Sequence, residues 1–182
     1  MMRPLAYSLR IAALATVFGL LALLVWRVTH QQHPPKVGGP APGFSARQLE
    51  GAGQLSLASL RGKAVVINFF QSYCEPCQAE SKALETAWQR YRHDGVVFLG
   101  VDYNDLVGDA RRFVSKHGVT YPVVRDPNGT VAAKYGITGT PETFFVDRRG
   151  RLVGAHIEGP IDEKQNRSLF AASIGVAAKQ TS

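Results

Sequence analysis

Residues 69–77 read Phe-Phe-Gln-Ser-Tyr-Cys-Glu-Pro-Cys and contain both cysteines of the chain, Cys74 and Cys77. They stand where an apolar run gives way to a helical pattern. The run at residues 64–70, Ala-Val-Val-Ile-Asn-Phe-Phe, is β-branched and aromatic with almost no polar interruption. Such a run is typical of a strand that is buried on both faces of a largely parallel sheet.

A helix is predicted to begin at Glu75. Pro76 is acceptable in the first turn of a helix, where its missing N–H would have no partner. Apolar side chains then recur at helical spacing, at Ala83, Leu84, Ala87, Trp88 and Tyr91. Cys74 is therefore expected at a strand-to-helix junction.

This position favours redox chemistry at the two cysteines. The unpaired N–H groups and the dipole at a helix N-terminus stabilise a negative charge, so Cys74 is predicted to be the nucleophilic thiolate and Cys77, one turn later, the resolving thiol. A disulfide between them closes a four-residue loop, for which chain entropy gives only about 2 kcal/mol. Stability alone is therefore a poor reason for the pair, although a purely structural disulfide remains the alternative.

The charge of the chain is concentrated at its N-terminus. The 182 residues, 45% of them hydrophobic, suit one globular domain with an appendage. The formal net charge is +7, but residues 1–39 contain four basic and no acidic side chains, which leaves 17 basic against 14 acidic residues in the remainder. The four are Arg3, Arg10, Arg27 and Lys36. A membrane anchor carries such basic flanks, and no Lys/Arg block indicates nucleic-acid binding.

Residues 1–28 are predicted to form a signal anchor with a single transmembrane helix. Residues 11–26 carry no charge, which is slightly short for a spanning helix and long for the core of a cleaved signal peptide. The sequence that follows has no convincing small-x-small cleavage site. The basic start is expected to stay in the cytoplasm, which places the remainder outside. A cleaved signal and a buried core helix are the alternatives.

Residues 29–39 are rich in Pro and Gly and predict a linker, and residues 40–178 predict the folded domain. Besides the strand and helix above, the domain has patterns typical of strands and helices. The strands are an N-terminal antiparallel pair at 44–49 and 54–57, two strands at 96–101 and 123–125, and a hairpin of 142–146 with 152–157; the helices are 109–117, 130–135 and 162–174. Crossovers followed by a hairpin require a mixed sheet, so the fold class is α/β.

Four motifs of this domain form a recognisable set. They are Ala-Pro-Gly-Phe at 41–44, Leu-Arg-Gly-Lys at 60–63, Cys-Glu-Pro-Cys at 74–77, and Tyr-Gly-Ile-Thr-Gly-Thr-Pro-Glu-Thr-Phe-Phe-Val-Asp at 135–147. With them the domain resembles the membrane-anchored thiol-disulfide oxidoreductases of the thioredoxin superfamily, the TlpA/ResA/CcmG (DsbE) type that serves cytochrome c maturation. The resemblance covers roughly residues 40–174 and implies a thioredoxin-like fold, with a central mixed sheet flanked by helices.

The resemblance also implies the residues that meet a client. A cis bond between Thr140 and Pro141 would lie beside the dithiol and present backbone to a bound client strand. Tyr73, which stands where many relatives carry Trp, would meet partners, and Glu142 would line the client groove. The plain alternatives are a proline that opens an edge strand, an aromatic ring packed over the dithiol, and an exposed Glu at the start of a strand.

Glu80 follows Cys77 by three residues and so shares a face of the helix with it. Burial there would raise the pKa of this carboxyl and make it a proton donor or acceptor for Cys77, a role that the resemblance also implies. The alternative is a Glu that merely complements the helix dipole. Negative charge from Glu75 and Glu80 disfavours a thiolate at Cys74, which predicts a reductant rather than an oxidant.

Partners are implied by the same resemblance. The expected clients are the haem-attachment cysteines of apocytochrome c, with copper-site cysteines in oxidase assembly as the alternative. An oxidising compartment would oxidise the pair unless something reduces it, and the resemblance implies a membrane electron donor of the CcdA or DsbD type. We expect a monomer on the bacterial cytoplasmic membrane, with its domain on the periplasmic side and without a cofactor.

Two other functions compete with thiol-disulfide exchange at this pair of cysteines. A metal-binding carrier could use the C-x-x-C pair as two ligands, but no histidine spacing completes a compact site, so no metal ligands are predicted. The histidines are His30, His33, His93, His117 and His156. A thiol peroxidase needs a threonine and an arginine around its peroxidatic cysteine, and Cys74 lacks that local pattern.

Overall fold

The computed structural model describes residues 3–29 and 34–179, and the side chains of residues 10–26 and 34–179. The chain divides into two units, residues 1–33 and 34–182. His30 and His33 of the predicted linker lie outside the described residues.

The first unit contains the helix α1 (Arg3–Thr29), whose described side chains are all exposed. Over the residues that the structure describes, none of the helices combines the length and the apolar character that crossing a bilayer requires. The anchor at residues 1–28 stays a prediction.

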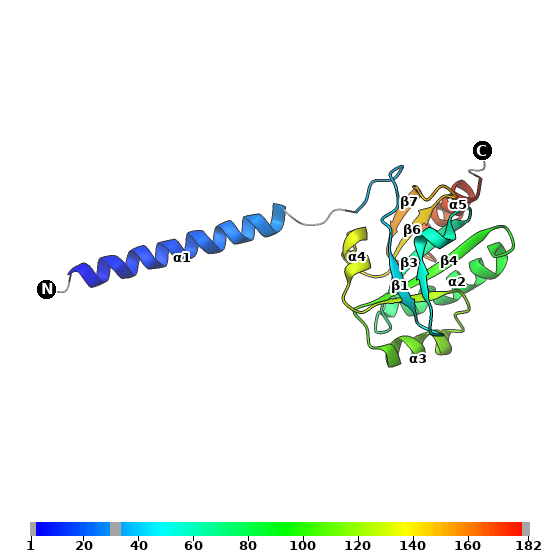
Figure 1. The fold of residues 1–182 in the computed structure, drawn as a ribbon, viewed down its shortest axis with the longest axis horizontal. Helices are drawn as coiled ribbons and strands as arrows, with labels where there is room; N and C mark the ends of the chain where they lie inside the picture. Colours follow the sequence, from blue (N-terminus) through cyan, green and yellow to red (C-terminus); the bar gives the residue numbers. More distant parts are fainter. Residues whose placement is uncertain (1–2, 30–33, 180–182) are drawn as a thin grey trace. The chain divides into compact units, whose positions relative to one another are not determined.

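The second unit is built on a seven-stranded sheet (Figure 1). Its order is β2-β1-β5-β4-β3-β6-β7. The strands are β1 (Ser45–Gln48), β2 (Gln54–Ser56), β3 (Ala64–Phe70), β4 (Val96–Tyr103), β5 (Val123–Asp126), β6 (Glu142–Val146) and β7 (Leu152–Glu158). β4 runs parallel to β3 and to β5, and the other neighbouring pairs are antiparallel. The predicted mixed sheet and the N-terminal hairpin are confirmed.

β3 is the central strand that carries the dithiol motif at its end. All seven of its side chains are buried, as the uninterrupted apolar pattern predicts. The register pairs Phe70 with Asp102 on β4 and Phe69 with Glu142 on β6. The C-terminal end of β3 is therefore flanked on both sides by an acidic residue.

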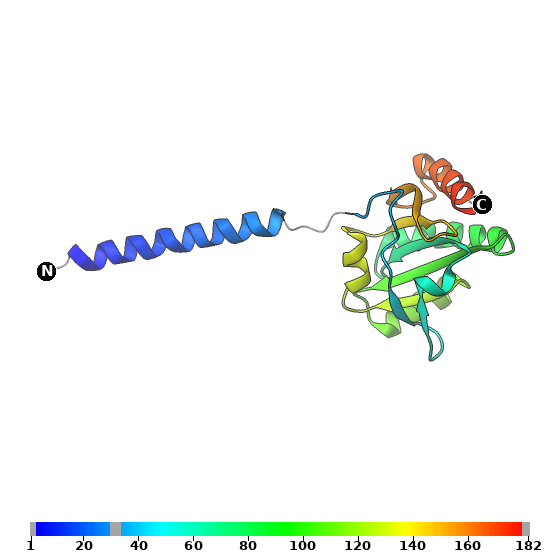
Figure 2. The ribbon, with the colours of Figure 1, turned by 45° about the horizontal axis from the view of Figure 1, so that its top comes forward.

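Helices cover both faces of this sheet (Figures 1 and 2). They are α2 (Glu75–Tyr91), α3 (Val107–His117), α4 (Thr130–Tyr135) and α5 (Lys164–Lys179), with a short 3-10 helix, η1 (Leu57–Leu60). On one face, Leu84 of α2, Phe113 of α3 and Phe170 of α5 belong to a single core cluster. On the other face, Tyr135 of α4 packs on Phe144 of β6, with ring centroids 5.1 Å apart. The two faces thus have separate hydrophobic cores.

The largest difference from the predicted elements is in α5, which runs from Lys164 to Lys179 rather than over residues 162–174. Its last turns continue because Ala177, with 1% of its surface exposed, still packs into the core. At the other end of the domain, Gly38 N donates to Leu152 O over 2.7 Å, so pairing with β7 starts within the predicted linker.

Candidate active site

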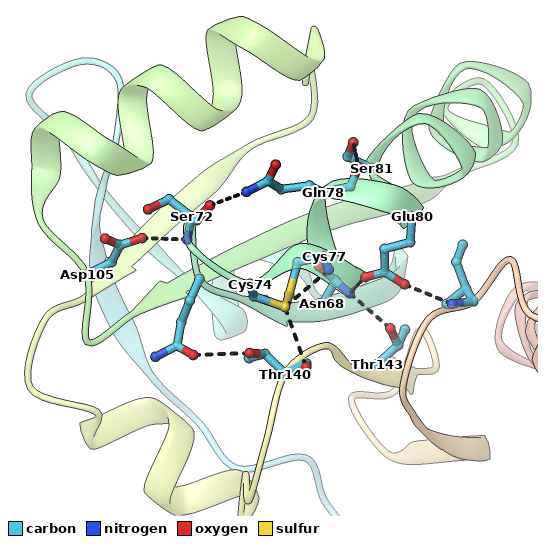
Figure 3. Close-up of a disulfide and its surroundings, with 12 residues drawn as sticks. Asn68, Ser72, Cys74, Cys77, Gln78, Glu80, Ser81, Asp105, Thr140 and Thr143 are labelled. Atoms are coloured by element: carbon cyan, nitrogen blue, oxygen red, sulfur yellow. Dashed lines mark hydrogen bonds between the residues drawn. A yellow bond between two sulfur atoms is a disulfide. The ribbon is translucent and has the colours of Figure 1, made fainter.

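Cys74 and Cys77 form a disulfide, with an S–S distance of 2.07 Å and Cα atoms 5.3 Å apart (Figure 3). Cys74 is the N-cap of α2, and its sulfur accepts a hydrogen bond from Cys77 N over 3.1 Å. The predicted strand-to-helix junction is therefore confirmed. Cys74 is 9% exposed and Cys77 1%, so Cys74 is the more accessible sulfur for a partner.

The loop before β6 faces the dithiol. The Thr140–Pro141 peptide bond is cis, as the resemblance implied. Thr140 O lies 3.5 Å from Cys74 Sγ, and Figure 3 shows the two residues facing each other. A disulfide sulfur carries no hydrogen, so this is a contact in the oxidised form and can become an S–H···O hydrogen bond only in the reduced form. Thr140 Oγ1 also donates to Gln71 Oε1 over 3.1 Å, which ties this loop to the segment that leads into Cys74.

Tyr73 is 67% exposed, immediately before Cys74 in the chain. Two further apolar side chains, Leu106 at 73% and Val107 at 42%, are exposed at the start of α3. Large apolar side chains that are exposed together can mark a surface that binds a partner. The position of Tyr73 is compatible with its predicted contact to clients and rules out an aromatic ring packed over the dithiol and shielded from solvent.

Glu80 is fully buried within the domain. Its carboxyl accepts hydrogen bonds from Asn68 Nδ2 over 2.8 Å and from Ile161 N over 2.8 Å. Burial raises the pKa of Glu80 to about 7, with a contribution from the negative charge of Asp162, although the two hydrogen bonds favour the ionised form. Glu80 therefore exchanges a proton near neutral pH, inside the protein and one turn beyond Cys77.

Asn68 and Thr143 extend this buried network. Asn68 Nδ2 also donates to Thr143 Oγ1 over 3.1 Å, and both residues are almost fully buried (Figure 3). The sequence alone predicts a role for neither residue. The available signal was the one polar residue inside the apolar run of β3, because a buried amide needs hydrogen-bonding partners.

Glu142 is buried in the structure. It was expected either to line the client groove or to be exposed at a strand start, but only 3% of its surface is accessible. Its carboxyl is turned inward: one oxygen accepts from the loop N–H groups of Thr138 and Gly139, and the other lies 2.7 Å from His156 Nε2. The exposed strand start was therefore wrong, because the fold brings partners to this carboxyl, and the place of Glu142 in the client groove stays a prediction.

A second polar group, also missed in the sequence, holds the segment before Cys74 (Figure 3). Asp105 Oδ2 accepts from Ser72 N over 2.6 Å. Arg125 donates to Asp105 O over 2.6 Å and to Asp102 Oδ2 over 3.3 Å. The carboxyl ends of parallel strands meet at one edge of a sheet, and this rule could have drawn attention to the acidic residues at the end of β4 and just after it.

Asp102 is buried at this edge, and one of its oxygens, Oδ1, has no hydrogen-bond partner in the described part of the chain. Burial and the nearby charge of Asp105 raise the pKa of Asp102 to about 7, although Arg125 acts in the opposite direction. Glu80 and Asp102 are therefore two buried carboxyls of the domain that both titrate close to neutral pH.

The described residues contain no group of three or more His, Cys, Asp and Glu side chains that could hold a metal ion. Of the histidines in the described part, His156 is occupied by Glu142, as given above. His93 lies in the turn after α2, and His117 ends α3 against the ring of Phe113.

A dithiol at the start of the helix that follows a central strand, faced by a cis-proline, defines a thioredoxin-like thiol-disulfide exchange domain. The sequence pattern of the AhpC/TSA family matches residues 37–155, and the chain belongs to this family.

Proteins similar to this chain agree with that class. The thiol-disulfide oxidoreductase ResA of Halalkalibacterium halodurans is 32% identical over 128 residues, which are 70% of this chain and 72% of the relative. The thiol:disulfide interchange protein DsbE homolog of Paracoccus denitrificans is 35% identical over 147 residues, 79% of each chain. A crystal structure of a DsbE-type interchange protein from Chlorobium tepidum superposes with a TM-score of 0.69 at 26% identity, over 79% of this chain and 100% of that one. The chain is a thiol-disulfide oxidoreductase.

Proposed function

We propose that this protein reduces client disulfides on the outer side of the cytoplasmic membrane, with the haem-attachment cysteines of apocytochrome c as its clients. The observation that carries the proposal is the buried Glu80 carboxyl, one turn beyond Cys77, with a pKa of about 7. Resolution of a mixed disulfide needs a base for the buried Cys77 thiol, and a carboxyl with this pKa is matched to that task near neutral pH.

The exchange begins with the reduced enzyme. The Cys74 thiolate attacks one sulfur of the client disulfide, a bond forms between Cys74 and the client, and the client's other sulfur leaves as a thiolate that takes up a proton. The Cys77 thiol then gives its proton to the Glu80 carboxylate, and the Cys77 sulfur attacks Cys74 Sγ. The Cys74–Cys77 bond forms as the client's second thiolate leaves, so two electrons pass from the enzyme to the client.

Thr140, Pro141 and Tyr73 form the client-binding surface in this proposal. The cis bond and the 3.5 Å contact of Thr140 O with Cys74 Sγ put an open stretch of backbone beside the reactive sulfur. An extended client segment can pair with such backbone, as strand addition does elsewhere. The exposed ring of Tyr73 provides an apolar contact on the cysteine side of the same site.

The direction of electron transfer rests on the charge around the dithiol. Glu75 stands in the first turn of α2, beside Cys74, and Glu80 lies behind Cys77. Negative charge there disfavours the Cys74 thiolate and so destabilises the reduced form of the pair. A strong oxidant needs a stabilised reduced form, so this pair is expected to be a reductant. The pair therefore gives up its electrons readily.

The membrane setting is part of the proposal. The described side chains of α1 are exposed and largely apolar, with a basic sequence before them, which suits an anchor. A membrane electron donor of the CcdA or DsbD type then returns the oxidised pair to the dithiol state after each turnover, and residues 29–39 serve as the tether.

The redox potential tests the direction. The full chain in detergent is equilibrated in thiol buffers, and the Cys74/Cys77 couple is measured for the wild type, Glu80→Gln and the matched control Glu85→Gln on the same helix. We expect a potential near or below the roughly −270 mV of thioredoxin. A value near the roughly −120 mV of a strong periplasmic oxidant would overturn the proposal that the protein is a reductant. We also expect Glu80→Gln, but not Glu85→Gln, to slow the resolution of a mixed disulfide.

A second experiment tests the client. Two oxidised peptides are compared as substrates, one with a C-x-x-C-H haem-attachment motif and one of the same length that contains the paired cysteines of an oxidase copper site. We expect a kcat/KM at least about tenfold higher for the haem-attachment peptide. Equal rates, or a preference for the second peptide, would assign the protein to copper-site reduction or to a general reductase.

A further inference from the structure

Glu142 holds the loop that faces the dithiol. Its Oε1 accepts from Thr138 N over 2.9 Å and from Gly139 N over 3.1 Å, and Thr138 Oγ1 is 3.4 Å away. These donors come from the two residues directly before Thr140. One carboxylate oxygen therefore fixes the backbone that leads into the Thr140 carbonyl and the cis-proline.

His156 holds the other side of the same carboxylate. Its Nε2 donates to Glu142 Oε2 over 2.7 Å, and its ring stacks on Phe144, with centroids 4.1 Å apart and an interplanar angle of 17°. Its Nδ1 lies 3.8 Å from Glu158 Oε1, whose side chain is 72% exposed. The imidazole is therefore packed in one orientation, and Glu142 has a fixed partner.

The sheet register explains why these groups meet. β6 and β7 pair antiparallel, with Glu142 opposite Glu158 and Thr143 opposite Ile157. Alternate side chains of a strand share a face, so Glu142 and Phe144 lie on the same side of β6, facing the same core as α4. The loop between α4 and β6 passes over that face, and its N–H groups come within reach of the carboxylate.

We propose that Glu142 and His156 are a positioning pair for thiol-disulfide exchange, which fix the loop at residues 138–140 in the shape that pairs with a client and do not touch the client themselves. The burial of Glu142 excludes direct contact in this conformation. Charge-assisted hydrogen bonds from backbone N–H groups are among the strong ones, so a single carboxylate suffices to order the loop. The proposal rests on the client-binding surface proposed above and is independent of the direction of electron transfer and of the client's identity.

The pair makes different demands on different substrates. A peptide disulfide must align its backbone with Thr140, so a loosened loop raises its KM. A small aromatic disulfide reacts with Cys74 without such pairing. Loss of the Glu142 contacts to the loop should therefore slow the reaction with the peptide disulfide and leave the reaction with the small disulfide almost unchanged. Damage to the dithiol or to the fold should slow both reactions.

Four variants of the full chain, each fully reduced before assay, test the proposal: Glu142→Ala, Glu142→Gln, His156→Ala and the control Glu158→Ala. Glu142→Ala removes the carboxylate that accepts hydrogen bonds from the loop and from His156. Gln keeps the acceptor for the loop and can donate to an unprotonated His156 Nε2, so it should restore function. Glu158→Ala removes the exposed carboxylate near His156 and leaves the loop contacts intact.

We expect Glu142→Ala to raise the KM for a peptide disulfide about tenfold, with kcat/KM for the small disulfide within about twofold of the wild type. The peptide KM of His156→Ala should lie between those of Glu142→Ala and the wild type. The values for Glu142→Gln and Glu158→Ala should stay close to the wild type. Hydrogen exchange at the amides of Thr138 and Gly139 should accelerate by about tenfold or more in Glu142→Ala. Because exchange is read directly in the folded protein, it tests the Glu142 contacts to the loop even where a variant is less stable.

Three results would overturn the positioning pair. An unchanged peptide KM together with unchanged amide exchange in Glu142→Ala would show that the loop does not depend on the carboxylate. An equal loss for both substrates would indicate a purely structural role. A Glu142→Gln variant as poor as Glu142→Ala, with slow exchange retained at the loop, would restore a direct contact between the Glu142 charge and the client.

Discussion

Replacing Glu80 with Gln should make the stability of the oxidised protein less dependent on pH between about 4.5 and 7. Glu80 is completely buried, and its pKa rises from 4.5 to about 7 in the folded protein. Between these values the unfolded chain has released this proton while the folded protein still holds it. The folded state binds more protons, so its stability falls as the pH rises.

The size of the effect follows from the shift. One pKa unit corresponds to 1.36 kcal/mol, so a rise from 4.5 to about 7 costs about 3 kcal/mol of unfolding free energy across this window. Below about pH 4.5 the side chain is neutral in both states and above about pH 7 it is ionised in both, so the contribution is flat at either end. Gln cannot ionise, and its variant loses this slope.

Urea unfolding of both proteins at pH steps from about 4 to about 8, with the disulfide intact, measures the difference. The free energy of unfolding of the variant also differs from that of the wild type by an amount that does not depend on pH, because the Asn68 amide must turn to match Gln. Only the change with pH is diagnostic. Asp102 titrates in the same window but is present in both proteins, so it cancels in the comparison.

We expect the free energy of unfolding of Glu80→Gln, relative to the wild type, to rise by about 3 kcal/mol from the acid to the neutral end. Two parallel profiles would show that Glu80 is ionised throughout this range in the folded protein. In that case the pKa of Glu80 would lie near its ordinary value, the carboxylate would be too weak a base to take the proton of Cys77 efficiently near neutral pH, and the proposed mechanism would lose its matched base.

Three further predictions concern single contacts. Cys77→Ser should trap a stable mixed disulfide between Cys74 and a client, detected as a mass increase that thiols reverse, and its absence would contradict Cys74 as the nucleophile. Asp105→Ala removes the acceptor 2.6 Å from Ser72 N and should cost about 1–2 kcal/mol in urea unfolding, whereas Asp109→Ala on α3 should cost less. Gly154→Ala places a Cβ 2.6 Å from Ser173 Cβ at a φ of +69°, so it should destabilise the packing of β7 on α5 by about 2 kcal/mol or more, and an unchanged melting temperature would argue against that contact.

The parts of the site that could be predicted are those with a local pattern. β3 was predicted because six of its seven successive residues are apolar or aromatic, which fits a strand that is buried on both faces. α2 was recognised because its apolar positions recur at helical spacing after a proline in the first turn. Cys77 and Glu80 lie in α2 and Cys74 is its N-cap, so the mutual placement of these three residues followed from the junction alone.

The parts that could not be predicted depend on partners distant in the chain. Glu142 was expected to be accessible because a strand start carries no sign of burial, and the imidazole that pairs with it is fourteen residues further on. The bond of Asp105 to Ser72 N spans thirty-three residues and depends on the meeting of two parallel strands at one edge. The composition of a segment does not reveal such contacts, because they depend on the topology and the register of the sheet.

Glu80 and Glu142 show how the same type of side chain takes different protonation states in two parts of one domain. Both are buried, and burial raises the pKa of each. Around Glu142, hydrogen bonds from His156, Thr138 and Gly139 outweigh burial and bring the pKa of this carboxyl below its usual value. Around Glu80, the hydrogen bonds from Ile161 and Asn68 do not outweigh burial, so the pKa of this carboxyl stays raised.

The two carboxyls are therefore suited to different tasks. Glu142 remains charged at neutral pH, so it can hold a loop but cannot exchange protons there. Glu80 titrates near neutral pH, so it can take the proton of Cys77 but is a weak anchor for the backbone. Consequently, the same Glu→Gln change should act differently at about pH 7: at position 80 it relieves a buried charge and removes the base for Cys77, whereas at position 142 Gln keeps an acceptor for the loop N–H groups and leaves the loop in place.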